Sequence, residues 1–201
     1  MKTIINLGRG FGSGGGFVGQ AIGRKLGIPV FDNELISRAA EESGYSKSLF
    51  AKGEEKSLFS VSSFFASGRL SYLDSGYVND NVLINIQSEV IRAIAEKGDA
   101  VIIGRCADYI LRDLPCLNVF VDGPEEYRIR RLMDNEHLTA AEAEKLMRRK
   151  DRTRETYYNY YTFGAWGQAS NYHLCVDSSI LGIEGTADFI IDFGRRAGLV
   201  R

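Results

Sequence analysis

The feature that most constrains this 201-residue chain is a run of glycines near its N-terminus. Residues 8–19 read GRGFGSGGGFVG and follow directly on an apolar run at residues 3–7. Glycine tolerates positive φ values and lets several backbone N–H groups approach an anion closely. A helix that begins after this loop adds the partial positive charge of its N-terminus. This position, between a first strand and a first helix, favours a phosphate-binding loop over a flexible linker.

The rest of the chain alternates short apolar runs with longer segments of helical period. Apolar runs lie at residues 28–31, 100–105, 117–122 and 173–177, and helices are expected at 34–42, from 79 or 80 to 98, after Pro124, from Thr139 and at 183–196. A capping box formed by Thr139 and Glu142 marks the start of the long basic helix. Such alternation is typical of a parallel sheet covered by helices on both faces, and it predicts a single α/β domain.

Charge and composition narrow the partners that the chain can have. The formal net charge of −1 argues against a dedicated nucleic-acid or membrane-surface protein. Residues 128–154 nevertheless hold nine Lys/Arg against five acids, which fits either a small anionic partner or a solvated helix face. The three cysteines, Cys106, Cys116 and Cys175, show no metal-ligand spacing and are expected as reduced, buried thiols. Without an apolar stretch long enough for a membrane span, we expect a cytoplasmic protein.

Two kinds of phosphate loop compete for the glycine run. A dinucleotide fingerprint, G-x-G-x-x-G, overlays residues 14–19, and Asp32 could bind a ribose. The fingerprint should begin at the end of the strand, however, and Gly14 lies seven residues past Leu7. A longer loop of the P-loop type fits the length better. Its signature, G-x-x-x-x-G-K-[ST], is incomplete here: with Gly14 as the second glycine, Gly15 replaces the lysine and Gly16 the Ser/Thr. Arg9 and Arg24 are candidates to supply the missing charge.

Residues 44–78 resist assignment. They mix Gly, Ser and aromatic residues without a clear period, yet are too apolar for a linker. The segment is either an insertion over a site or a contact in a homo-oligomer.

Several segments, taken in order, resemble the cytidylate-kinase-like family of bacterial P-loop proteins. They are the loop at 10–16, FDNELI at 31–36, VIIGRCADYIL at 101–111, VFV at 119–121 with YRIRR at 127–131, KDRTR at 150–154 with Tyr157, Tyr158 and Trp166, and NYHLC at 171–175. Together they cover nearly the whole chain, with residues 50–95 matching least.

The resemblance implies a P-loop three-layer α/β/α sandwich with a central parallel sheet, a helical insertion that binds a nucleoside monophosphate, and a helical lid. The single domain would divide into a core at residues 1–36, 98–122 and 172–201, the insertion at about 37–97 and the lid at about 124–168. It also implies roles for individual residues. The donor triphosphate would bind Gly10, Gly12, Ser13, Gly14, Gly15 and Gly16; the acceptor would meet Asp32, Arg105, Asp108 and Arg128; and Arg131, Asp151 and Arg154 would act in catalysis.

These residue types suit phosphoryl transfer, which needs positioning and cations around the moving group more than covalent help. The guanidinium fork of arginine holds two phosphate oxygens at once. Simpler roles also fit: Asp151 and Arg154 as a surface i,i+3 salt bridge, Arg105 as the partner of a nearby acid, and Asp32 as a helix cap.

The expected function is therefore ATP-dependent phosphoryl transfer to a nucleoside monophosphate, with CMP or dCMP favoured and Mg²⁺ required. Its partners would be small nucleotides, and no metal-binding residue is assigned. The missing lysine leaves a second hypothesis, a nucleotide-binding or partner-binding protein without catalysis. A dinucleotide-dependent oxidoreductase is the third.

Overall fold

The computed structural model describes residues 2–33, 35–36 and 77–201. The expected helix at 34–42, the unassigned segment at 44–78 and most of the expected insertion at 37–97 lie outside these residues, apart from their described ends. The division of the chain into core, insertion and lid stays a prediction.

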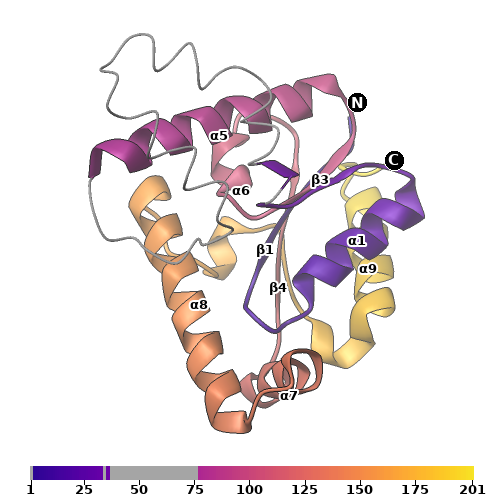
Figure 1. Ribbon diagram of the computed structural model, residues 1–201. Helices are drawn as coiled ribbons and strands as arrows, with labels where there is room; N and C mark the ends of the chain where they lie inside the picture. Colours follow the sequence, from indigo (N-terminus) through magenta and orange to yellow (C-terminus); the bar gives the residue numbers. More distant parts are fainter. Residues whose placement is uncertain (1, 34, 37–76) are drawn as a thin grey trace.

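The described chain is built on a five-stranded parallel sheet of order β2-β3-β1-β4-β5 (Figure 1). The strands are β1 (Ile4–Arg9), β2 (Val30–Phe31), β3 (Ala100–Ile103), β4 (Leu117–Asp122) and β5 (Leu174–Asp177). Strand β1 is central, with Leu7 opposite both Ile103 of β3 and Val119 of β4. The glycine-rich loop therefore leaves the sheet at the middle of its carboxyl edge.

This strand order separates the two loop hypotheses. In the dinucleotide-binding fold the order is 3-2-1-4-5-6, so the first strand pairs with the second. Here β1 pairs with β3, and β2 lies at the sheet's edge. The dinucleotide-dependent oxidoreductase is therefore inconsistent with the topology, and the longer P-loop type of connection is the one that the fold contains.

Helices cover both faces of the sheet and complete three layers, as the resemblance implied (Figure 1). Because strand side chains alternate between faces, Ile5 and Leu7 pack against α1 (Gly15–Leu26) and α9 (Ser178–Arg196). Ile4 and Ile102 point to the other face, where they meet α5 (Tyr77–Lys97) and α6 (Ala107–Ile110). Among the described residues, no helix is long and apolar enough to cross a membrane.

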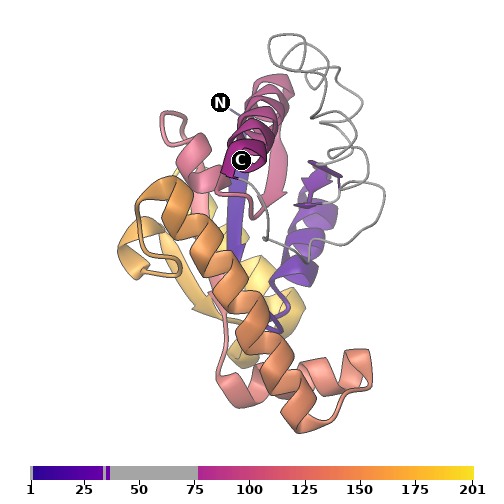
Figure 2. The same ribbon diagram turned by 60° about the vertical axis from the view of Figure 1, so that its left-hand side comes forward.

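Two further helices, α7 (Glu125–Glu136) and α8 (Ala140–Thr162), form a hairpin beside the carboxyl edge of the sheet (Figures 1 and 2). The predicted capping box between them is confirmed, since the Thr139 side chain and the Glu142 carboxylate each accept the other's backbone N–H. A small cluster of Leu132, Ala143 and Met147 joins the helices, and Phe11 of the loop packs against it. The short 3₁₀ helix η1 (Ala169–Asn171) then leads to β5.

One sequence expectation about the core is wrong. Cys106 and Cys116 are buried free thiols, whereas the free thiol Cys175 is exposed. Cys175 lies on the edge strand β5 between Leu174 and Val176, both of which pack on the α1/α9 face. Alternation along the strand directs Cys175 away from that core.

At Gly194, α9 packs closely against β4 and the C-terminal residues. A Cβ at this position would lie 2.5 Å from Val200 Cγ2 and 2.8 Å from Leu117 Cδ2. We expect Gly194→Ala to lower the free energy of unfolding by about 1–3 kcal/mol because of overpacking. Gly98→Ala is the control, since no atom lies within 4 Å of its Cβ position. Urea denaturation compares the two variants, and equal stabilities would contradict the close packing.

Candidate phosphate-binding site

The loop between β1 and α1 takes a shape that only glycine permits at two positions. Gly12 and Gly14 have φ values of +84° and +81°, a region that other residues rarely adopt. A Cβ at Gly12 would lie 2.8 Å from the Arg128 carbonyl oxygen, and one at Gly14 would lie 2.5 Å from Ile183 Cδ1. The glycines therefore admit both the backbone conformation and the close contact with α7 and α9.

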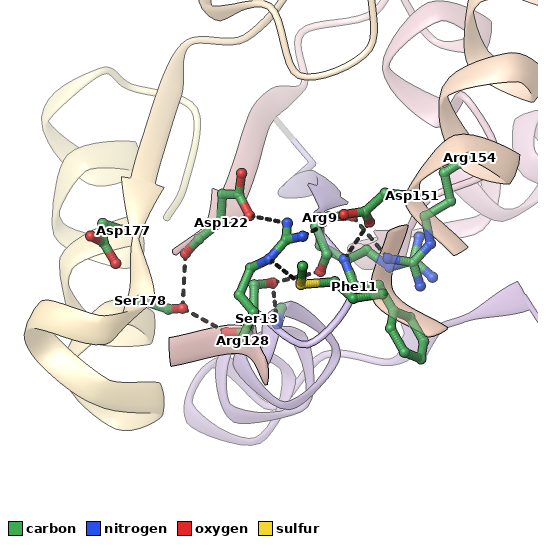
Figure 3. Close-up of polar contacts among 12 residues, drawn as sticks. Arg9, Phe11, Ser13, Asp122, Arg128, Asp151, Arg154, Asp177 and Ser178 are labelled. Carbon is green, nitrogen blue, oxygen red and sulfur yellow. Dashed lines mark hydrogen bonds and ion pairs between the residues drawn. The ribbon is translucent and has the colours of Figure 1, made fainter. Parts of the chain in front are cut away.

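Ser13 holds this loop together from inside. Its buried hydroxyl donates to the Gly10 carbonyl at 2.9 Å and accepts the Gly15 N–H at 3.2 Å. The Ser13 carbonyl in turn accepts the Ser178 hydroxyl at 2.6 Å, at the first residue of α9 (Figure 3). Ser13 was expected as a nucleotide ligand, but the structure shows its side chain bonded to the loop itself.

Several loop N–H groups remain available to an external acceptor. Those of Gly12, Gly14, Gly16 and Phe17 have no acceptor within the described part of the chain, whereas the Phe11 N–H is bonded to Asp151. Free N–H groups that converge at a helix start form a cradle for an anion. The first turn of α1 therefore fits a phosphate group.

Arg131 of α7 brings positive charge to the same place. Its Nη2 lies 3.2 Å from the Cβ position of Gly14, and its guanidinium carbon lies 5.8 Å from the ring centre of Phe17. The Arg131 Nε is buried and, among the described residues, has no hydrogen-bond partner. A buried donor without an acceptor costs free energy, and the guanidinium beside Gly14 places positive charge next to the loop.

Arg128, one turn earlier on α7, is bound differently. Its Nη1 pairs with Asp122 at 2.8 Å and its Nη2 with Asp151 at 2.5 Å (Figure 3). Burial acts to lower the pKa of Arg128, but the two carboxylates outweigh it and raise the pKa. With only 8 % of the residue exposed, Arg128 ties α7 to β4 and α8, and its expected role in acceptor binding stays a prediction.

Asp151 and Arg154 contact the loop rather than each other. The Asp151 carboxylate accepts the Phe11 N–H at 2.7 Å, while Arg154 Nη1 donates to the Arg9 carbonyl at 3.0 Å (Figure 3). No ion pair joins the two side chains, so the alternative of a surface salt bridge is wrong. Burial lowers the pKa of Arg154, with Asp151 acting to raise it and Arg128 to lower it. Their common helix face thus meets the loop, as a catalytic pair would require.

The end of β3 supplies a second group of polar side chains. Arg105 donates from its Nε to the Asn33 side chain and lies over the Tyr157 ring at 5.4 Å. Within the described residues it has no ion pair with an acid. Asp32 accepts the Leu35 N–H at 3.0 Å, as a cap does. Arg105 has a φ of +59°, an uncommon conformation that tends to occur at functional sites.

Asp108 is a half-buried candidate on α6. Its carboxylate accepts the Tyr158 hydroxyl at 2.7 Å and so links α6 to α8. Burial raises the pKa of Asp108, although this hydrogen bond acts to lower it. A role in acceptor binding stays a prediction for Asp108, because its observed partner belongs to the protein.

The two arginines considered as substitutes for the lysine are placed very differently. Arg24 projects from the far end of α1, where its exposed side chain pairs with Glu184 at 2.6 Å. It cannot reach the loop, so this suggestion is wrong. Arg9 is the last residue of β1, and its side chain lies near Arg154 and Arg105.

Sequence reasoning missed the positioning residues of the site. Ser178 and Phe11 fix the loop through contacts with residues more than 130 positions away, at Ser13 and Asp151. Asp122, the partner of Arg128, was also missed, although its place at the end of a strand run was a usable signal. None of these partners can be recognised from local periodicity.

A parallel sheet of this order, with a glycine-rich loop at the end of its central strand and arginines above it, defines a P-loop α/β protein of the nucleoside-monophosphate-kinase type. The sequence match is more specific. Residues 4–180 match the model of the cytidylate kinase-like family, and the chain belongs to this family. Membership and fold support nucleotide-dependent phosphoryl transfer as the general class of activity.

Solved structures agree with this fold. An uncharacterized protein from Eubacterium ventriosum is 26% identical, with a TM-score of 0.71 over 96% of this chain and 98% of that one. A shikimate kinase from Acinetobacter baumannii, in complex with shikimate, is 13% identical with a TM-score of 0.53, covering 99% and 96%. Protein TT1252 from Thermus thermophilus is 18% identical with a TM-score of 0.52, covering 96% and 97%. The last two show the fold alone. No curated protein matches the sequence significantly.

Arg128→Met tests whether the Arg128 ion pairs hold the site together. Without the cation, the carboxylate of Asp151, only 18% exposed, loses its ion-pair partner and keeps only the Phe11 N–H. Removing one member of a buried pair costs about 3–5 kcal/mol, and we expect about 2–3 kcal/mol here because Asp122 is 48% exposed. Arg130→Met, at an exposed position of the same helix, should change stability by less than about 0.5 kcal/mol. Chemical denaturation that found the two variants equal would contradict this role.

Proposed function

We propose that the chain is an ATP-dependent kinase that transfers the γ-phosphoryl group to a nucleoside monophosphate, with CMP or dCMP as the acceptor. The observation that carries this proposal is the loop at the start of α1, where several N–H groups have no acceptor in the described residues and the Arg131 guanidinium lies beside Gly14. The cytidylate kinase-like family supports the choice of acceptor.

The donor triphosphate would lie along the loop. The N–H groups of Gly12, Gly14 and Gly16 fit phosphate oxygens, and Arg131 fits the charge of the polyphosphate chain. Among the described residues, no three acidic, histidine or cysteine side chains cluster as metal ligands. Mg²⁺ needs only one or two carboxylates when phosphate oxygens complete its shell. MgATP therefore fits this loop, and the ion would help to neutralise the transferring group.

The acceptor would lie toward the end of β3. Arg105 follows β3 and donates to Asn33, while Arg154 donates from α8 to the Arg9 carbonyl; neither has an ion pair with an acid within the described residues. Unpaired arginines on this side favour an acceptor that carries its own phosphate. A nucleoside monophosphate satisfies this condition.

The proposed reaction breaks the bond between the β,γ-bridging oxygen and the γ-phosphorus of ATP. A phosphate oxygen of the acceptor forms the new bond to that phosphorus, and ADP leaves with the electron pair. Arg131 and Arg154 would stabilise negative charge on the oxygens of the phosphoryl group in transit. No covalent intermediate with the protein is required.

A second candidate function is nucleotide binding without transfer. The observation that favours it is Gly15, which leaves the loop without the lysine that normally reaches the β- and γ-phosphates. The two functions share the cradle and differ only in turnover.

ADP release from MgATP across a panel of nucleoside monophosphates tests the proposal, with shikimate as a non-nucleotide acceptor. We expect turnover that depends on CMP or dCMP. Arg154→Ala should lower kcat/KM about a hundredfold or more, because one cation at the transferring group is lost. Arg152→Ala, an exposed arginine two residues earlier, is the matched control and should retain activity.

The outcomes separate the candidate functions. Turnover with another nucleotide corrects the acceptor alone, and turnover with shikimate moves the activity to another substrate class. ATP binding with no acceptor-dependent ADP release contradicts the kinase and supports binding without transfer.

A further inference from the structure

Arg9 occupies the space that a lysine in the loop would need. A Cβ at Gly15 would lie 2.5 Å from Arg9 Cβ and 3.2 Å from Arg9 Cγ. These separations are far shorter than the contact distance of about 3.5–4.0 Å between carbon atoms. A side chain at position 15 and the observed side chain at position 9 therefore exclude each other.

The P-loop signature specifies a residue type at both positions 9 and 15. In G-x-x-x-x-G-K the second glycine falls at Gly14, so the first glycine falls at position 9 and the lysine at position 15. This chain has arginine at position 9 and glycine at position 15. The two residues are in contact in the fold. Compared with the signature, the cation is therefore at position 9 instead of 15, and the glycine is at position 15 instead of 9.

The Arg9 side chain runs from the loop toward the end of β3. Its guanidinium occupies the space beside Gly104, where a Cβ would overlap Arg9 Nη1. Gly104 also has a φ of +79°. A second glycine thus makes room for the same side chain, and the guanidinium comes to lie between the loop and the acceptor side of the site.

Positive charge is concentrated around this guanidinium. Burial, followed by the charges of Arg154 and Arg105, lowers the pKa of Arg9 to about 9, and Asp32 acts to raise it. At neutral pH the side chain still carries its charge. In the described part of the chain no carboxylate forms an ion pair with Arg9 within 4.0 Å, while Arg154 Nη1 donates to the Arg9 carbonyl (Figure 3) and its charge acts on the Arg9 side chain. Like charges held this close repel one another, and an anion between them would stabilise the arrangement.

We propose that Arg9 replaces the missing loop lysine, and that its guanidinium binds the phosphate group at the junction of the donor and acceptor sites. The cation reaches this position from the end of β1 instead of from α1. Arg9 forms and breaks no bond in this role and acts through charge and hydrogen bonds alone. The inference rests on the proposed function, because it assigns a ligand to the same phosphate cradle.

Phosphate binding by charge variants tests the proposal directly. Inorganic tripolyphosphate and MgATP are titrated into the whole chain by calorimetry, without an acceptor. Arg9→Gln keeps much of the side chain and removes its charge. We expect the dissociation constants of both probes to rise by about tenfold or more. Arg24→Gln removes an arginine of α1 that pairs with Glu184, and it should bind both probes as the wild type does.

An exchange of residues distinguishes a phosphate ligand from a merely structural arginine. Arg9→Gly removes the cation and the clashing Cβ, and it should weaken tripolyphosphate binding as Arg9→Gln does. Adding Gly15→Lys to Arg9→Gly recreates the glycine and the lysine of the signature. We expect the double variant to bind within about threefold of the wild type, because the charge returns to the same phosphate. Thermal melting without ligand shows which variants are folded.

Two results would overturn the inference. One is wild-type affinity in Arg9→Gln; the other is a folded double variant that binds no better than Arg9→Gly. If the double variant does not fold, Arg9→Gln alone decides. Binding of tripolyphosphate without turnover on any acceptor would contradict the proposed kinase activity. The comparison of Arg9→Gln with the wild type would then still test phosphate binding by Arg9. A wild-type chain that binds neither probe would contradict both proposals.

Discussion

The pairing of β1 on both of its edges is the constraint on which the rest of this structure depends. Each backbone N–H and C=O of a buried strand needs a partner, and β1 finds them in β3 and β4. The loop after β1 must then emerge at the centre of the carboxyl edge, between two neighbouring strands. Ligands of open α/β sheets bind at this edge. The backbone of one strand therefore decides where the phosphate cradle lies.

Charge balance separates the arginines around this cradle into two kinds. Arg128 is neutralised by Asp122 and Asp151 and joins three elements of the fold. Arg131 and Arg154 reach the loop without an ion pair to any acid in the described part of the chain. A paired cation stabilises the protein that holds it, whereas unpaired cations at one place leave charge for a ligand. The difference between the paired Arg128 and the unpaired Arg131 and Arg154 therefore distinguishes an arginine that stabilises the fold from arginines available to a ligand.

The sequence predicted much of the frame, because local patterns carry it. The apolar runs became strands, the capping box at Thr139 opened α8, and the glycine run became the loop. The predictions that failed depended on tertiary placement. Cys175 is exposed because an edge strand turns one face away from the α1/α9 core. Arg24 is remote from the loop because α1 carries it to the opposite end.

By itself the sequence determined that a glycine-rich loop lies between the first strand and the first helix, the succession of strands and helices along the chain, and the family. Glycine conformational freedom and hydrophobic period are properties of neighbouring residues, so they can be read without a structure. Only the tertiary structure decided which charges meet. Arg9 and Arg154 are 145 positions apart, yet they lie together at the loop. That contact depends on strand register and helix packing, which bring distant residues together and which no local pattern records.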